Sequence, residues 1–371
     1  MTMPGQEIGP IGLAVVGAGY WGPNLVRNAM ATEAFDVRIL CDLDVEKARR
    51  VLGRYSTVHA TGSLEQVLAD QNVAAVAIAT PAATHLAVAM AALEAGKHVL
   101  VEKPLAATYA EGLQLVEAAD RHGLVLMLDH TYCYTSAVAH LRSLVRSGAL
   151  GELQYLDSVR INLGLVQPDV DVFWDLAPHD LSIFDAILPE GVRPVAVAAH
   201  GSDPIAAGRA CVGHLTIELS TGAMAHVHVN WLSPTKVRTM IVGGSARTVV
   251  FDDLDPSQRI SVYDRGVDRA QPGDLGADAR RQTIVSYRTG DMVAPALPER
   301  EALRGVMVEY AAAISESRAP LTDGRSGLRV LALLEAASAS LAQGGAFLPV
   351  LDGYDGYDGE LVTATRDGVG A

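Results

Sequence analysis

Short apolar runs alternate with amphipathic segments over the first 130 residues. The runs are typical of buried strands and fall at residues 11–16, 37–41, 73–79, 98–101 and 124–128. The segments between them have the pattern of helices, at 23–30, 45–54, 64–69 and 85–95, and Thr108 and Glu111 form a capping box for a helix that ends at Gly123. This alternation predicts a doubly wound domain over residues 1–130, in which helices cover both faces of a parallel sheet.

From residue 131 onwards, strand-like runs follow one another with little helix between them. The runs fall at 153–161, 194–200, 210–218, 224–230, 237–242, 248–251 and 260–263, and helices are expected at 138–146, 178–188, 304–316 and 327–342. This order predicts an α+β domain over residues 131–352 with a large, mostly antiparallel sheet. Residues 264–300, rich in Gly, Asp, Arg and Pro, are expected to form a loop, and residues 353–371 a polar tail.

Composition and charge narrow the class of partner. The 371 residues suffice for two domains and carry a formal net charge of −14, which argues against nucleic acid or an anionic membrane surface as the main partner. The three cysteines show no CxxC pairing, as expected for a protein of the reducing cytoplasm. The segment 73–93 lacks acidic and basic residues, but Thr80 and Pro81 divide it into a strand and a short helix, so no membrane span is expected.

A glycine motif directly follows the first expected strand and opens the first expected helix. Its sequence, Gly17-Ala-Gly19-Tyr20-Trp21-Gly22, has the GxGxxG spacing. Glycines there allow a tight turn, let the backbone approach a pyrophosphate and let the helix pack closely on the strand, while the helix N-terminus attracts the phosphate charge. The motif alone is equally compatible with a purely structural turn.

Asp42, at the end of the second expected strand, strengthens the nucleotide-binding interpretation. A carboxylate at this place accepts the ribose hydroxyls of NAD and repels a 2′-phosphate. Leu43 follows it and the nearest cation is Lys47, so NAD is favoured over NADP. Asp42 is also suited to cap the helix expected at 45–54.

Two further strands end in residues that suit a ligand site. The strand at 98–101 runs into Glu102, Lys103 and a proline, and the strand at 73–79 runs into Thr80, Pro81 and then His85. In an open parallel sheet, ligands bind beyond the carboxyl ends of the strands. We therefore expect Lys103 to hydrogen-bond a reacting hydroxyl and stabilise a developing alkoxide, although a lysine at a strand end is usually a solvated surface residue.

The segment Trp174-Asp175-Leu-Ala-Pro178-His179-Asp180 opens a helix of the second domain. We expect Pro178 in the first turn and Asp175 near the N-cap. Because Asp175 and His179 are four residues apart, they share one helix face if the helix begins early enough. His179 suits proton transfer near neutral pH, and a nearby lysine would keep it neutral. Taken alone, the pair is more simply explained as a helix cap and a structural histidine.

Other chemistries fit these residues less well. Asp175, His179 and Asp180 have no second cluster to complete a metal site, and Lys103 would repel a cation, so no metal is expected. The histidines of the segment 226–228 alternate on one strand face and are better explained as a sheet pair. The chain also lacks the GxSxG elbow of serine hydrolases.

The motifs GAGYWG, AIATPAATH, VEKP and WDLAPHD, in this order, resemble those of the Gfo/Idh/MocA oxidoreductases over nearly the whole chain. The resemblance implies an N-terminal Rossmann domain and a C-terminal α/β domain whose open sheet mediates dimers or tetramers. It also implies NAD(P)-dependent oxidation or reduction of a sugar or cyclitol carbon. The family's EKP lysine falls on Lys103, and its DxxxH pair falls on Asp175 and His179.

A narrower resemblance concerns members that act on nucleotide-linked sugars, such as UDP-N-acetylglucosamine 3-dehydrogenases. Residues 19–28, the pair His130-Thr131 and residues 158–164 carry it. On this basis Arg160 and Asn162 are candidate contacts to the sugar.

The combined hypothesis is an NAD-dependent dehydrogenase of a secondary ring alcohol, or a reductase of the corresponding ketone. The pyrophosphate is expected at residues 17–22 and the ribose at Asp42, with the nicotinamide half bordered by Thr80, Pro81, His85, Glu102 and Lys103. The substrate is expected among Lys103, Arg160, Asn162, Trp174, Asp175 and His179, with His179 taking the hydroxyl proton. The alternatives are an inositol, aminocyclitol or free-sugar dehydrogenase, and a non-catalytic regulator that binds NAD or a sugar.

Overall fold

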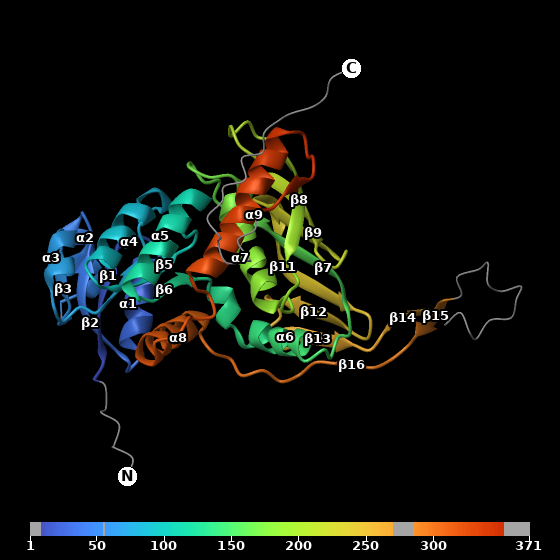
Figure 1. The fold of residues 1–371 in the computed structure, drawn as a ribbon, viewed down its shortest axis with the longest axis horizontal. Helices are drawn as coiled ribbons and strands as arrows, with labels where there is room; N and C mark the ends of the chain where they lie inside the picture. The colour runs from blue at the N-terminus through green and yellow to red at the C-terminus, as the bar shows by residue number, and fades with distance from the viewer. Residues whose placement is uncertain (1–8, 55, 270–284, 352–371) are drawn as a thin grey trace, which may run out of the picture.

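A six-stranded parallel sheet forms the N-terminal part of the computed structural model, which describes residues 9–54, 56–269 and 285–351 (Figure 1). The strand order is β3-β2-β1-β4-β5-β6. The strands are β1 (Ile11–Val16), β2 (Phe35–Cys41), β3 (His59–Thr61), β4 (Ala75–Ile78), β5 (His98–Glu102) and β6 (Leu126–Asp129). The connecting helices are α1 (Gly22–Met30), α2 (Val45–Leu52), α3 (Leu64–Ala69), α4 (His85–Glu94) and α5 (Tyr109–His122). Because each strand reaches the next through a helix, all neighbours are parallel, and the predicted doubly wound fold is confirmed.

Alternate residues of each strand enter two separate cores, one on each face of this sheet. In β1, Leu13 and Val15 pack towards α1 and α8 (Ala302–Glu316), whereas Ala14 and Val16 pack towards α4, α5 and α9 (Gly324–Ala342). The hydroxyl of Tyr310 in α8 lies 3.4 Å from a carbonyl oxygen of β4. Two helices from the C-terminal end of the chain therefore help to cover the N-terminal sheet.

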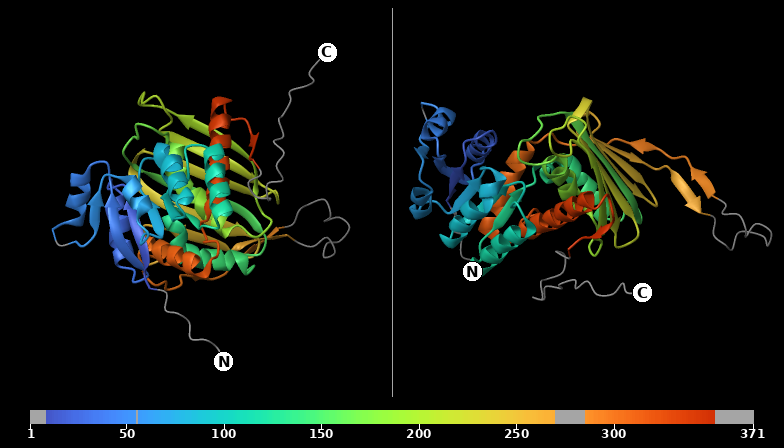
Figure 2. Two further views of the ribbon diagram at one scale, coloured as in Figure 1. Left: turned by 60° about the vertical axis from the view of Figure 1, so that its left-hand side comes forward. Right: turned by 90° about the horizontal axis from the view of Figure 1, so that it is seen from above.

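A nine-stranded sheet forms the second part, in the order β16-β13-β12-β11-β7-β10-β9-β8-β17. Its strands are β7 (Leu153–Leu163), β8 (Pro194–Ser202), β9 (Val212–Leu219), β10 (Met224–Asn230), β11 (Leu232–Gly244), β12 (Thr248–Asp252), β13 (Ile260–Tyr263), β16 (Met292–Val293) and β17 (Leu348–Pro349). Only the pair of β7 and β10 is parallel among its described strands. Helices α6 (Ser136–Arg146), α7 (Val172–Ile187) and α9 cover one face, and the other face is open (Figure 2). The predicted large, mostly antiparallel sheet is confirmed.

Helix α7, which carries Asp175 and His179, begins earlier than predicted. Asp171 is its N-cap, because the Asp171 carboxylate accepts two backbone N–H groups of the first turn. The prediction that Pro178 lies in the first turn was wrong, since this proline is inside the helix, where its nitrogen has no hydrogen to donate. Asp175 therefore occupies the first turn, and His179 lies on the same face one turn later.

The prediction of a loop over residues 264–300 was wrong in part. Strands β14 (Gly266–Arg269) and β15 (Val285–Arg288) pair as an antiparallel ribbon that projects from the body of the protein (Figure 1), and β16 joins the edge of the nine-stranded sheet. The short strands β3 and β17 were not predicted. The expected tail at 353–371 lies outside the described residues.

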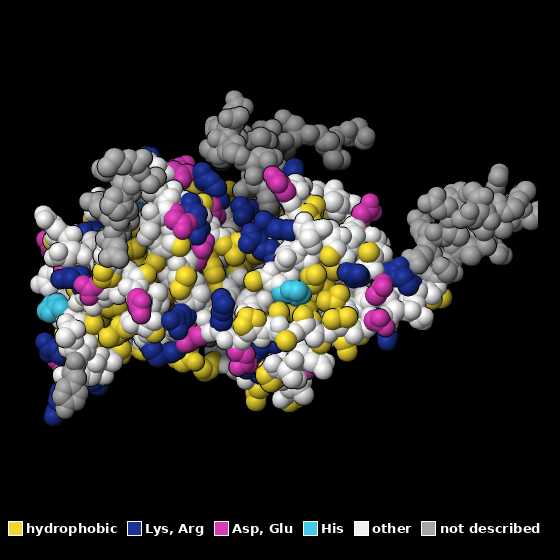
Figure 3. Space-filling model, turned by 90° about the horizontal axis from the view of Figure 1, so that it is seen from below, with side chains coloured by type: hydrophobic (Ala, Val, Ile, Leu, Met, Phe, Trp, Pro, Cys, Tyr) yellow, Lys and Arg dark blue, Asp and Glu magenta, His cyan; other side chains and the backbone are white. Residues whose placement is uncertain are grey.

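The surface and the cysteines add three facts. No helix in the described part of the chain is long and apolar enough to cross a membrane. Acidic and basic side chains are interspersed with hydrophobic ones over the face drawn in Figure 3. Cys41, Cys133 and Cys211 are all buried and free.

Candidate active site

The glycine-rich turn after β1 leaves open space beside the N-terminus of α1. Gly17 has a φ of +103°, and a Cβ there would lie 2.5 Å from the carbonyl oxygen of Ala79, so only glycine fits. A Cβ at Gly22 would lie 2.0 Å from the carbonyl oxygen of Gly17. At Gly19, in contrast, the nearest atom to an added Cβ is the Nζ of Lys47 at 4.0 Å. Because no side chain of the described residues caps α1, its first N–H groups and this space fit the pyrophosphate of a dinucleotide.

Asp42 braces this turn from the end of β2. Its Oδ2 accepts the N–H of Ala18 at 2.7 Å, and its Oδ1 accepts the N–H of Asp44 at 2.9 Å. The helix-capping role considered for Asp42 belongs to Asp44, whose side chain caps α2. Tyr20 in the turn and Leu43 beside Asp42 are 91% and 97% exposed, so both leave apolar surface open to solvent.

Two carboxyl groups and an indole meet where β5 and β6 end. Glu102 pairs in register with Asp129. Burial raises the pKa of Glu102 well above its usual value, and the negative charge of Asp129 raises that pKa further. Trp21 donates from Nε1 to Oδ2 of Asp129 at 3.2 Å, and Thr131 donates to its Oδ1 at 2.7 Å. The glycine-rich turn is thereby tied to the strand ends, where ligands of such sheets bind.

His85 joins the segments that follow β4 and β5. It is buried, and its two ring nitrogens lie 2.8 Å from the carbonyl oxygen of Pro104 and 2.9 Å from that of Thr80. Burial lowers the pKa of His85. Thr80 and Pro81 therefore lie at a fixed edge of the sheet, beside the end of the neighbouring strand β5, which Lys103 follows.

Lys103 connects the N-terminal sheet to α7. Its Nζ donates to the backbone carbonyl of Asp175 at 2.8 Å and lies 3.4 Å from the Oδ1 atom of that residue. The other carboxylate oxygen, Oδ2, accepts the Nε1–H of Trp231 at 2.9 Å. The side chains of Lys103 and Asp175 are 21% and 20% exposed, so a substrate is able to reach both.

His179 lies among positive charges on the second turn of α7. Its Nδ1 is buried and has no hydrogen-bond partner among the described residues. Desolvation lowers the pKa of His179 well below its usual value, and the charges of Lys103, Arg160 and Arg238 lower this pKa further. The imidazole is therefore neutral at physiological pH and able to accept a proton.

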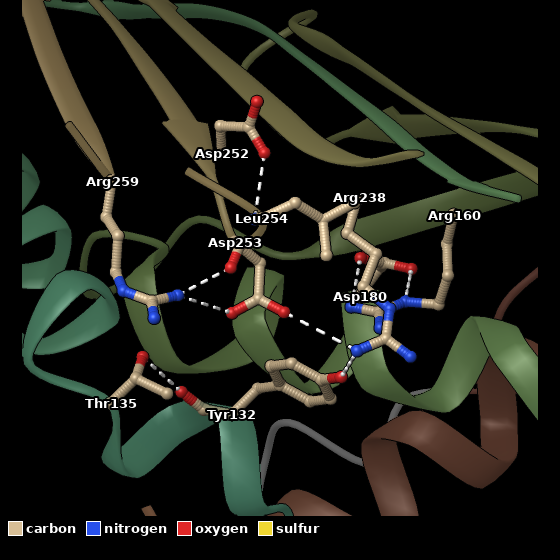
Figure 4. Close-up of polar contacts among 9 residues, drawn as sticks. All are labelled: Tyr132, Thr135, Arg160, Asp180, Arg238, Asp252, Asp253, Leu254 and Arg259. Atoms are coloured by element: carbon tan, nitrogen blue, oxygen red, sulfur yellow. Dashed lines mark hydrogen bonds and ion pairs between the residues drawn. The ribbon is translucent and has the colours of Figure 1, made fainter. Parts of the chain in front are cut away.

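Arg160 and Arg238 surround the ring of Tyr132 (Figure 4), and this ring packs against His179. The two rings meet edge to face, with centroids 5.1 Å apart. Arg160 forms a bidentate pair with Asp180 at 2.7 and 3.0 Å, and its guanidinium carbon lies 4.5 Å from the centroid of the Tyr132 ring. The Tyr132 hydroxyl accepts a hydrogen bond from Arg238 at 2.7 Å. The phenol is thus held on its face and at its hydroxyl.

The remaining predicted substrate contacts lie around this centre. Trp174, which precedes Asp175, donates from Nε1 to the Ser338 hydroxyl at 2.9 Å. Arg160 is buried and bound to Asp180, and Asn162 lies two residues further along β7, half-buried. The structure therefore joins Lys103 to Asp175 directly and places His179 one turn further along α7, within range of the Lys103 charge. Trp174, Arg160 and Asn162 lie around these three residues.

Sequence reasoning missed four residues of this centre: His130, Tyr132, Trp231 and Arg238. The first two directly follow β6, so the rule that singled out Lys103 at the end of β5 also applies to them. Trp231 directly follows β10 and Arg238 lies in β11, and no local pattern in the chain marks either residue.

The histidines of strand β10 belong to no metal site among the described residues. In the described ranges 9–54, 56–269 and 285–351, no three His, Cys, Asp or Glu side chains are placed to hold a metal ion. His228 instead stacks on His214 of the neighbouring strand, with ring centroids 4.2 Å apart.

Comparisons with known proteins place the chain in a family. Residues 11–130 match the oxidoreductase family with an NAD-binding Rossmann fold, and residues 138–250 match the GFO/IDH/MocA C-terminal domain. A UDP-N-acetylglucosamine 3-dehydrogenase of Acidithiobacillus ferrooxidans is 30% identical over 86% of this chain and 93% of its own length. A solved structure of UDP-N-acetylglucosamine 3-dehydrogenase GnnA from that organism has a TM-score of 0.74 at 27% identity, covering 90% of this chain and 98% of its own.

Two further solved structures share the architecture. GenD2 from gentamicin A biosynthesis, in complex with NAD, is 25% identical with a TM-score of 0.74, covering 94% of this chain and 99% of its own. An inositol dehydrogenase homologue from Azotobacter vinelandii, complexed with NADH and myo-inositol, is 21% identical with a TM-score of 0.75, covering 92% of this chain and 98% of its own. At this identity the likeness shows the fold alone. The chain belongs to the Gfo/Idh/MocA family of oxidoreductases and carries that family's NAD-binding Rossmann domain.

Proposed function

We propose that the protein is an NAD-dependent dehydrogenase that oxidises a secondary ring alcohol of a nucleotide-linked sugar, or reduces the corresponding ketone. The observation that carries this proposal is the meeting of Lys103, Asp175 and His179 at the end of β5, beside a turn shaped for a dinucleotide. A relative named UDP-N-acetylglucosamine 3-dehydrogenase, which matches most of the chain, supports the nucleotide-linked substrate.

The cofactor site of this proposal uses residues of the N-terminal sheet. NAD, when bound, supplies the acceptor for the hydride. The turn at 17–22 holds the pyrophosphate, and Asp42 accepts the ribose hydroxyls and repels a 2′-phosphate. Thr80, Pro81, His85 and Glu102 border the nicotinamide half.

In the proposed reaction, Lys103 and His179 act on the same substrate oxygen. The Lys103 ammonium donates to the hydroxyl and stabilises the negative charge that develops on its oxygen. His179, neutral before reaction, accepts the hydroxyl proton as the hydride leaves the carbon, and returns it in the reverse direction. Asp175 holds Lys103 in place, and Trp231 holds Asp175.

A cavity beside Tyr132 supports a substrate larger than one sugar ring. Its volume is about 790 Å³, and its lining includes Tyr132, Thr135, Arg259, Pro298 and Arg300. This volume lies within the range of small-molecule sites in proteins.

We also propose that residues 131–352 mediate a homodimer or homotetramer through the open face of the nine-stranded sheet. Tyr155 and Leu163 of β7 and Met224 of β10 are exposed on these strands, at 37%, 76% and 37%. Burying them against a second copy removes apolar area from water. Light scattering coupled to size-exclusion chromatography tests this: the wild type is expected to be oligomeric and the Tyr155→Glu, Met224→Glu double variant monomeric, whereas a monomeric wild type would refute it.

The first test of function follows NAD reduction by absorbance with a panel of substrates. The panel holds UDP-N-acetylglucosamine, other UDP- and dTDP-sugars, their uronic acids, free hexoses and inositols. Reduction with nucleotide sugars alone supports the proposal, whereas reduction with a free sugar or cyclitol overturns its nucleotide part only. If NAD binds but neither the alcohols nor the corresponding ketones with NADH react, the dehydrogenase proposal fails.

The same assay tests the role of His179. In His179→Ala, turnover is expected to fall about 10²–10⁴-fold because the general base is lost. Calorimetric titration with NADH serves as the control and should give the wild-type affinity. Unchanged turnover would rule out proton transfer by this residue.

A further inference from the structure

His130 is a buried imidazole with no hydrogen-bond partner. It is 1% exposed, and both of its ring nitrogens lack partners in the described protein. His85, on the same edge of the sheet, has in contrast a carbonyl oxygen within 2.9 Å of each ring nitrogen, so its one N–H has an acceptor. Leaving a buried polar group unpaired costs stability, so a core histidine that serves packing alone is normally hydrogen-bonded.

The strand register places His130 in the reaction centre. Glu102 and Asp129, the last residues of β5 and β6, pair in register, so Lys103 and His130 are the residues that directly follow two neighbouring parallel strands. Tyr132, two residues after His130, packs its ring against His179. His130 is thus flanked by the residue that binds the substrate oxygen and the residue beside the general base.

Electrostatics make His130 a neutral hydrogen-bonding group. Burial lowers the pKa of His130 to about 3, with a further contribution from the charge of Lys103. A neutral imidazole offers one N–H donor and one acceptor nitrogen. A sugar hydroxyl, which both donates and accepts, matches either nitrogen.

We propose that His130 is a substrate-binding residue that hydrogen-bonds a hydroxyl on the ring carbon next to the one oxidised. The ligand class is a polyhydroxylated ring with neighbouring hydroxyl groups, and the inference rests on the proposed dehydrogenase function. Both ring nitrogens are buried in the free protein, so the side chains around the ring must shift as the substrate binds, and the hydrogen bond then offsets the cost of leaving the ring unpaired.

The variant His130→Phe separates this role from a structural one. Phenylalanine has a similar shape and no polar atoms, so the thermal unfolding temperature should stay the same or rise. NADH affinity should be unchanged. With UDP-N-acetylglucosamine, kcat/KM should fall about 10–100-fold, because the hydrogen bond to the substrate is lost.

Two further variants make the comparison specific. His130→Gln keeps a donor and an acceptor and should recover part of kcat/KM. His98→Gln is the matched control, because His98 begins β5 at the opposite end of the sheet and bonds the backbone N–H of Val125 at 3.0 Å. Its kcat/KM should equal that of the wild type.

A deoxy substrate identifies the contact. If oxidation is at C3, the neighbouring hydroxyl is at C4. The wild type should then have a lower kcat/KM for the 4-deoxy analogue than for UDP-N-acetylglucosamine. His130→Phe should have the same kcat/KM for both substrates. The inference is overturned if His130→Phe keeps kcat/KM within about twofold of the wild type. It is also overturned if removal of the 4-hydroxyl lowers kcat/KM by the same factor in the wild type and in His130→Phe. If the wild type oxidises nothing in the panel, the proposed function fails and the inference fails with it.

Discussion

The Nζ of Lys103 and the backbone carbonyl of Asp175 are 2.8 Å apart and link the N-terminal sheet to the helix that carries the candidate base. That carbonyl lies in the first turn of α7. Pro178, inside the same helix, has no N–H to donate to the carbonyl of Trp174. The helix therefore departs from its regular hydrogen-bond pattern in the stretch where it contacts Lys103.

Trp231 is expected to control how well Asp175 holds Lys103. In Trp231→Phe, the hydrogen bond to Oδ2 of Asp175 is lost while most of the ring packing stays. Because a hydrogen bond to a charged group contributes about 1.5–3 kcal/mol, kcat/KM should fall roughly tenfold or more. Steady-state kinetics measure this, with calorimetric NADH binding as the control. Wild-type kcat/KM in this variant would show that the indole does not matter for catalysis.

Arg238 is expected to set the pH range of activity. Its charge lowers the pKa of His179, so Arg238→Met should raise that pKa towards 6.5. A base with a higher pKa becomes protonated at a higher pH, so the acid limb of kcat/KM should move to higher pH. Arg259→Met is the matched control for the pH profile, because Arg259 pairs with the same Asp253 as Arg238 but bonds the Asp253 backbone instead of the Tyr132 hydroxyl beside His179. Equal pH profiles for wild type and Arg238→Met would contradict the expectation.

Asp42 is expected to decide the choice of cofactor. In Asp42→Ala, the N–H of Ala18 loses its acceptor and the ribose loses its carboxylate, so the Kd for NAD should rise roughly tenfold or more. The preference over NADP should shrink, because the 2′-phosphate is no longer repelled. Asp44→Ala is the control: it removes the cap of α2, at a cost of about 1 kcal/mol in stability, and should leave the preference intact. If the ratio of the Kd values for NAD and NADP were the same in Asp42→Ala as in the wild type, Asp42 would not be the residue that selects NAD.

The buried pair of Arg160 and Asp180 is expected to be a large single contribution to stability. Both side chains are 4% exposed, so Asp180→Ala leaves an unpaired guanidinium and should lower the free energy of unfolding by about 3–5 kcal/mol. The double variant Arg160→Met, Asp180→Leu removes both charges and should lose much less. Urea unfolding curves measure both. If the two variants were equally unstable, packing rather than charge burial would be the cause.

Much of the architecture could be predicted because it depends on local patterns. The strand bounds 224–230 and 260–263 agree with the structure to the residue, and the glycine motif and Lys103 lie at strand ends as the alternation implied. The failures also have physical causes. Asp171 was missed as the cap of α7 because Pro178 gave a stronger local signal for a helix start. The strands β3 and β17 are too short to show a period of two.

The residues that surround His179 and Asp175 could not be predicted, because the side chains that contact one another there are distant in the chain. Arg238 reaches Tyr132 across 106 positions, and Trp231 reaches Asp175 across 56. His130 raises a different difficulty, since its significance lies in hydrogen bonds that it does not make. Such a feature appears only once every neighbouring side chain has been placed.

The three tryptophans of the chain lie around the candidate site: Trp21 in the glycine-rich turn, Trp174 beside Asp175, and Trp231 bound to its carboxylate. The intrinsic tryptophan emission of the protein therefore originates next to its expected ligands. A reduced nicotinamide ring absorbs in the range where indoles emit, so bound NADH should quench that emission. The unlabelled protein thus carries its own optical reporter of cofactor and substrate binding.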